Sequence, residues 1–118
     1  MPPEQDFLKK VLTVIEKRLG EERFNVTELS REISMSRTQL HRRLQALQQP
    51  SASALLRASR LRRGEMLLQK TGLSVTEVAY RCGFRSAAYF AQCFREDFGV
   101  TPSQFRDGAK SDLGKRIP

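Results

Sequence analysis

The side chains best suited to recognition chemistry lie in a polar stretch near position 40. Thr38, His41 and Arg42 recur at the three- and four-residue steps that place side chains on one face of a helix. An arginine fork can donate two hydrogen bonds to the acceptor pair on a guanine edge, and threonine and histidine can also hydrogen-bond to bases. We expect these three residues to contact bases, although a solvated helix face is the alternative and a lone surface histidine often has no function.

A second stretch, fifty residues later, has a different chemical character. It offers one amide, one phenol and several methyl groups, which suit contacts with thymine methyls and a looser sequence preference. We expect base contacts from this stretch as well, but discrimination mainly from the first. The alternative is that the alanines only permit close packing against a phosphate backbone. The residues concerned are Ala87, Ala88, Tyr89, Ala91 and Gln92.

The charge distribution predicts a polyanionic partner. The 118 residues carry a formal charge of +8, and no acidic residue lies between Glu32 and Glu65. Neutralising phosphates releases counterions, so such a basic surface favours nucleic acid. Replacing Arg60 or Arg63 should then mainly flatten the salt dependence of binding. The predicted phosphate contacts are Ser36, Arg37, Arg43, Arg60, Arg63, Arg85, Ser86 and Arg95.

Other chemistries are not indicated. His41 is the only histidine, Cys82 and Cys93 each lie in an apolar helical context, and the acids are scattered. We therefore expect no enzyme activity, metal site, cofactor or small-molecule ligand. The N-terminus has no run resembling a signal peptide or membrane span, which predicts a cytoplasmic protein without a membrane partner.

A sequence repeat predicts how the two polar stretches are positioned. Val26-Thr27-Glu28-Leu29 is echoed 49 residues later by Val75-Thr76-Glu77-Val78. With one extra residue in the second turn, Ser36, Leu40 and Leu44 fall opposite Ser86, Phe90 and Phe94. Each copy reads as a short helix, a tight turn and a second capped helix, which is the outline of a helix-turn-helix unit.

The remaining periodicity completes an all-α fold of about seven helices. An amphipathic helix over residues 4–19 should pack on the first unit, and a long helix should connect the units through Leu55, Ala58, Leu61, Gly64 and Leu68. We predict a first helix-turn-helix subdomain over residues 1–50, a connector helix over 51–70, a second subdomain over 71–107 and a flexible tail over 108–118. A short last helix should begin at Pro102 and fray beyond Gly108.

Several motifs resemble the signature of AraC/XylS-type transcription regulators. They are Ser36-Arg37-Thr38-Gln39-Leu40-His41-Arg42-Arg43-Leu44, Arg60-Leu61-Arg62-Arg63, Gly83-Phe84, Ala88-Tyr89-Phe90, Cys93-Phe94-Arg95, Phe98-Gly99-Val100-Thr101-Pro102 and Phe105-Arg106. The resemblance covers residues 7–106 and includes both units and the connector. Two residues depart from the family pattern. Ser34 lies in the first turn, where the family often has glycine, and Gly64 lies in the connector, where the family usually has alanine.

The resemblance implies a function on double-stranded DNA. Such domains place two recognition helices in successive major grooves on one face of the duplex, and an activator of this family would also contact RNA polymerase. The sequence also resembles the effector end of two-component regulators or hybrid sensor kinases. A non-specific architectural or RNA-binding basic helical protein is the alternative, although RNA modules more often expose aromatic platforms for base stacking.

Overall fold

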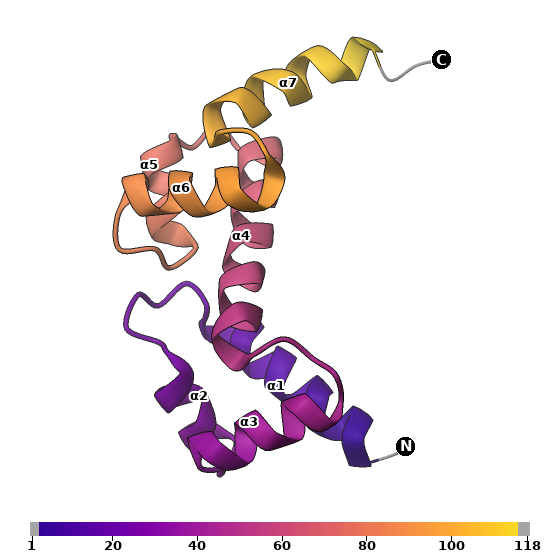
Figure 1. Cartoon of the computed structure of the whole chain (residues 1–118). Coiled ribbons are helices and arrows are strands. Elements are labelled where there is room, and N and C mark those ends of the chain that lie inside the picture. The colour runs from indigo at the N-terminus through magenta and orange to yellow at the C-terminus, as the bar shows by residue number, and fades with distance from the viewer. Residues whose placement is uncertain (1–2, 116–118) are drawn as a thin grey trace.

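The computed structural model describes residues 3–115, and within them it contains helices and no strand. The all-α fold and its seven helices are as predicted (Figure 1). The helices are α1 (Pro3–Arg18), α2 (Val26–Glu32), α3 (Arg37–Ala46), α4 (Ala52–Lys70), α5 (Val75–Arg81), α6 (Ala87–Phe98) and α7 (Pro102–Lys115).

The sequence repeat is a structural repeat. In the first turn the amides of Ser34 and Met35 donate to the carbonyls of Arg31 and Ser30. In the second turn the amides of Gly83 and Phe84 donate to the carbonyls of Tyr80 and Ala79, which occupy the equivalent positions. The extra residue predicted in the second turn is Arg85, because Phe84 matches Met35 and Ser86 matches Ser36 as the cap of the next helix.

Side-chain caps begin the helices where the sequence predicts them. Ser36 with Gln39 and Ser74 with Glu77 form complete capping boxes, in which each partner satisfies an otherwise unpaired amide of the first turn. Asn25 also accepts from the Glu28 amide, but the Glu28 carboxylate pairs with Arg31 instead of returning to the cap. At Asn25 the reciprocal arrangement of a capping box is therefore only half present.

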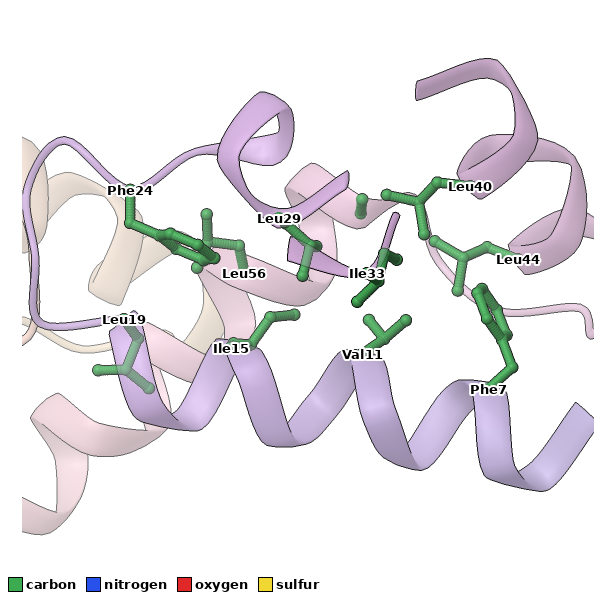
Figure 2. Close-up of a cluster of buried hydrophobic side chains, with 11 residues drawn as sticks. Phe7, Val11, Ile15, Leu19, Phe24, Leu29, Ile33, Leu40, Leu44 and Leu56 are labelled. Carbon is green, nitrogen blue, oxygen red and sulfur yellow. The ribbon is translucent and has the colours of Figure 1, made fainter. Parts of the chain in front are cut away.

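The first of two hydrophobic cores is built on α1. Its apolar stripe faces α2, α3 and the start of α4, as Figure 2 shows, and the predicted packing of this helix on the first unit is confirmed. Burial of this stripe is what stabilises α2, because a seven-residue helix is marginal by itself. The buried members are Phe7, Val11, Ile15, Leu19, Phe24, Leu29, Ile33, Leu40, Leu44, Ala52 and Leu56.

The second core joins the far half of α4 to α5, α6 and α7. Phe90 and Phe94 are fully buried in it. Arg106 of α7 donates to the carbonyls of Leu68 and Thr71 at 3.1 and 3.4 Å, which satisfies acceptors at the C-terminal end of α4. Phe84 of the second turn is also buried in this core.

Gly64 allows α4 to approach α6 closely. A Cβ at this position would lie 2.8 Å from Cε1 of the buried Phe90 ring. Glycine weakens a helix interior, and this close packing of α4 against Phe90 compensates for that cost.

The buried face of α4 differs in its first half from the prediction. Leu61, Gly64 and Leu68 are buried as expected, but Leu55 and Ala58 are only half-buried. Leu56 and Ser59 are buried in their place. The reason is that α4 changes partners along its length, from the α1 core to the α5–α6 core, so its buried stripe does not follow one straight line.

The last helix is longer than predicted. It begins at Pro102 after a capping box between Thr101 and Gln104, but it continues through Gly108 to Lys115. The helix therefore does not end near Gly108 as predicted, because a single glycine weakens a helix without having to end it. The flexible tail over residues 108–118 stays a prediction. Residues 116–118 lie outside the described part of the chain.

No helix in the described residues combines the length and apolar character needed to cross a bilayer.

Both cysteines are buried and unpaired in the second core. Burial raises the pKa of the Cys82 thiol to about 12. Because the thiolate is the reactive form, Cys82 should carry almost no reactive thiolate at pH 8. We expect the folded protein to resist a thiol-specific reagent such as Ellman's reagent at pH 8, and both thiols to react after unfolding in urea. Labelling of the folded protein as fast as free cysteine would contradict this burial.

Candidate DNA-binding surface

The first polar stretch lies at the exposed N-terminal half of α3. Thr38, His41 and Arg42 are all exposed, while Leu40 and Leu44 turn inward and anchor the helix. Arg37, Thr38 and His41 line a groove whose opposite wall is the start of α4. Arg42 lies outside the lining of this groove but remains exposed.

A second groove joins this surface to the second unit. It has a volume of about 790 Å³ and shares Val26, Ser51 and Ser53 with the first groove. Its far wall is the start of α6, with Ser86 and Tyr89 among its lining residues. The N-terminal ends of α3 and α6 thus open onto one continuous surface, on the same side of α4 (Figure 1).

The residues predicted to read bases from α6 are not all equally accessible. Ala88, Tyr89 and Gln92 are exposed, whereas Ala91 is half-buried. Ala87 is half-buried too and, unlike Ala91, packs against the second core, so we withdraw it from the predicted base contacts.

Tyr89 is the largest exposed side chain of α6 near this surface. It is 50% exposed. The neighbouring Cys93 raises the pKa of the Tyr89 phenol, and Arg57 opposes this shift by favouring the phenolate. Tyr89 therefore stays a neutral donor and acceptor, and Arg57 of α4 lies close to it.

The serines predicted to contact phosphates cap the two helices. The hydroxyl oxygens of Ser36 and Ser86 accept from the amides of Gln39 and Tyr89 at 3.0 and 3.1 Å. Because each oxygen acts as the acceptor, the hydroxyl proton remains available for donation to a phosphate oxygen. Arg37, Arg85 and Arg95 are exposed near these helices, and none forms an ion pair in the described residues.

Arg60 has a different place from the one predicted. Its Nε donates to the Leu19 carbonyl at 2.8 Å, and one terminal nitrogen donates to the carbonyls of Glu21 and Phe24, each at 2.9 Å. Burial lowers the pKa of this guanidinium, and the three carbonyl dipoles stabilise the cation in return. These internal bonds make Arg60 a structural residue, so we no longer assign it a phosphate contact.

Arg63 and Arg43 also have partners within the protein. Arg63 pairs with Glu16 of α1 at 2.9 Å and lines a groove along α1 that shares no residue with the two grooves described above. The Arg43 guanidinium lies over the Phe7 ring, 4.1 Å from its centroid. These contacts direct both side chains toward α1, so we withdraw their predicted phosphate contacts as well.

A three-way junction, formed by Leu19, Arg60 and Gly83, holds the two units together. Gly83 has a φ of +89°, and a Cβ there would lie 2.0 Å from the Leu19 carbonyl oxygen and 2.7 Å from Arg60 Nε. The end of α1, the connector and the second turn therefore meet around one carbonyl. No local pattern in the sequence indicates this contact, because its members are 41 and 23 residues apart.

No group of three His, Cys, Asp or Glu side chains is arranged to hold a metal ion in the part of the chain that the structure describes.

Comparison with known proteins places this architecture in a family. The sequence profile described as a helix-turn-helix domain matches residues 29–108. The HTH-type transcriptional regulator GbdR of Pseudomonas aeruginosa is 38% identical over 104 residues, which cover 88% of this chain and 28% of GbdR. The chain thus spans well under half the length of this curated relative.

Two solved structures share the fold over most of their length. The DNA-binding domain of the global transcriptional factor AdpA, in complex with a target DNA, has a TM-score of 0.82 at 31% identity, covering 89% of this chain and 94% of that one. A Chromobacterium violaceum transcriptional regulator with an AraC-type DNA-binding domain has a TM-score of 0.81 at 27% identity, covering 89% and 93%. The chain therefore belongs to the AraC/XylS-type helix-turn-helix family, whose members are DNA-binding domains of transcription regulators.

Proposed function

We propose that the protein recognises a bipartite site on double-stranded DNA by inserting the N-terminal halves of α3 and α6 into successive major grooves. One observation carries this proposal. The two helices open onto one continuous surface. The junction of Leu19, Arg60 and Gly83 fixes the two units that carry these helices relative to each other. Successive major grooves on one face of B-DNA lie about 34 Å apart, one helical turn, and two recognition elements on one face of the protein are the arrangement that such a pair of grooves requires.

The exposed side chains suggest a division of labour. Sequence discrimination should come mainly from the first unit, where an arginine is available for guanine, and α6 should add contacts with methyl groups and a phenol. The proposed base contacts are Thr38, His41, Arg42, Ala88, Tyr89, Ala91 and Gln92. The proposed phosphate contacts are Ser36, Arg37, Arg85, Ser86 and Arg95.

Selection of bound duplexes from a random pool at near-physiological salt tests the proposal. We expect a motif with two half-sites whose centres are about 10 base pairs apart. Selection of duplexes without any shared motif would instead favour a non-specific architectural protein, and preferential binding of single-stranded RNA would favour an RNA-binding protein.

Arg42→Ala should weaken binding to the selected site by about 1 to 3 kcal/mol and relax the preference at one base position. The reason is that the exposed guanidinium would lose paired hydrogen bonds to one base edge. Affinities for the selected site and for its single-base variants, measured at fixed salt, provide the test.

Lys9→Ala is the matched control for Arg42, because it removes one exposed positive charge from the separate groove along α1. It should leave the base preference unchanged. If Arg42→Ala weakened binding equally to all duplexes, Arg42 would be a phosphate contact and not a base contact.

The proposal extends to RNA polymerase as a partner and to activation of transcription. It is supported by the transcriptional regulators among the relatives of this chain and by the exposed helix faces that the DNA-binding surface does not use. Action on a chromosome would place the protein in the cytoplasm. A purified transcription reaction on a promoter bearing the selected site should give more transcript with the protein than without it, and less transcript would make it a repressor. That the chain is the effector end of a two-component regulator stays a prediction.

A further inference from the structure

Arg57 lies between the two units on the DNA-binding surface. It is exposed on the second turn of α4 and lines the large groove between the units. Ser53, near the first unit, lines the same groove, as do Arg85 and Ser86 of the second unit. Arg57 and Tyr89 of the second unit line this groove together. Arg57 itself is not among the predicted base or phosphate contacts, although Arg85, Ser86 and Tyr89 of the same groove are.

Arg57 differs from the other connector arginines in its partners. Arg60 donates to three carbonyls, Arg62 donates to the Ser59 hydroxyl at 3.2 Å, and Arg63 pairs with Glu16. Among the ion pairs of the described residues none includes Arg57, although Glu22 lines the same groove. Arg57 is thus the connector arginine that lines this groove, is exposed and forms no ion pair within the described residues.

The geometry of B-DNA determines what faces Arg57 in a complex. When two recognition helices occupy successive major grooves on one face of a duplex, the minor groove of the intervening base pairs faces the protein between them. A narrow minor groove, typical of A·T runs, concentrates negative potential and attracts arginine side chains. A positive side chain on the connector is therefore opposite the part of the duplex whose width depends most on sequence.

We propose that Arg57 enters the minor groove between the two half-sites and makes affinity depend on the base composition of this spacer. The inference rests on the proposed function and adds specificity at base pairs that neither recognition helix contacts. Arg57 would read groove width and not a base-edge pattern, because the minor groove distinguishes little beyond A·T from G·C.

Spacer substitution in the selected duplex tests this role. Both half-sites are kept, and the spacer is made of A·T, G·C or inosine·C pairs. Inosine·C presents the G·C pattern in the major groove but lacks the amino group that widens and obstructs the minor groove. We expect the protein to bind the A·T and inosine·C spacers about tenfold more tightly than G·C, the scale of one unfavourable base pair. Arg57→Ala should bind all three with equal affinity.

Arg62→Ala is the matched control, since Arg62 is exposed on the same helix but donates to Ser59. It should keep the full spacer preference. Failure to select any bipartite site would overturn the proposed function, and this inference with it. A bipartite site bound without spacer preference, or a preference that survives in Arg57→Ala, would overturn the role of Arg57 alone. Circular dichroism of each variant establishes that it is folded.

Discussion

Gly83→Ala is expected to destabilise the protein by about 3 kcal/mol or more, because it combines backbone strain with a steric clash. The residue has a left-handed φ of +89°, and the added Cβ would lie 2.0 Å from the carbonyl oxygen of Leu19. Backbone atoms at both sides of this contact have to move apart, which also disturbs the hydrogen bond from Arg60 to the same oxygen. The free energy of unfolding in urea measures the effect.

Gly99→Ala separates the two causes. Gly99 also has a left-handed φ, of +79°, but nothing lies within 4 Å of the position its Cβ would take. Its replacement should cost only about 1 to 2 kcal/mol, the strain of the left-handed conformation alone. Equal losses in the two variants would show that Gly83 is needed for its φ and not for the contact with Leu19.

Arg60→Ala is expected to cost about 2 to 4 kcal/mol of stability, because three carbonyls lose their charged donor. The loop between α1 and α2 and the second turn should then move more freely relative to the connector. Affinity for the bipartite site should fall, while the slope of affinity against salt concentration should stay unchanged, since Arg60 is not a phosphate contact. Urea unfolding and a salt titration of binding measure the two effects separately.

Arg62→Ala serves as the control here too, because Arg62 is exposed and makes one long hydrogen bond. It should change the free energy of unfolding by less than about 0.5 kcal/mol. If Arg60→Ala instead left stability intact and flattened the salt dependence, the guanidinium would bind phosphate in the complex.

Local patterns in the sequence predicted the repeated units well. The caps at Ser36, Ser74 and Ser86 and the burial of Phe90 and Phe94 depend on neighbours within about one helical turn, which the sequence displays directly. Exposure of Thr38, His41 and Arg42 followed from the same periodicity. The helices and the exposed surface of the first unit could therefore be predicted from the sequence.

The hydrogen-bond and ion-pair partners of the arginines could not be predicted in this way. Arg60 bonds to carbonyls that are 36 to 41 residues away, and Arg63 pairs with a carboxylate 47 residues away. Charge and periodicity show only that both residues are basic and belong to a helix. The tertiary contacts then decide which of the connector arginines is available to a ligand.

The two turns show that a tertiary contact also decides where glycine is required, which the sequence alone does not reveal. Ser34 and Gly83 occupy equivalent positions, and both have a positive φ. Serine is accepted in the first turn because that position is exposed, whereas the second turn is pressed against Leu19 and has no room for a side chain. The sequence showed the departure at Ser34 but not the contact that makes glycine necessary at Gly83.

Binding to duplexes with altered half-site spacing tests most directly whether the connector and the junction hold α3 and α6 toward one face of DNA. Five added base pairs rotate one half-site to the opposite face, and ten restore its direction but add one turn, about 34 Å. We predict that either insertion reduces affinity to that of a single half-site, a loss of about 100-fold. Equal affinity for all three spacings would contradict a rigid pair of recognition helices.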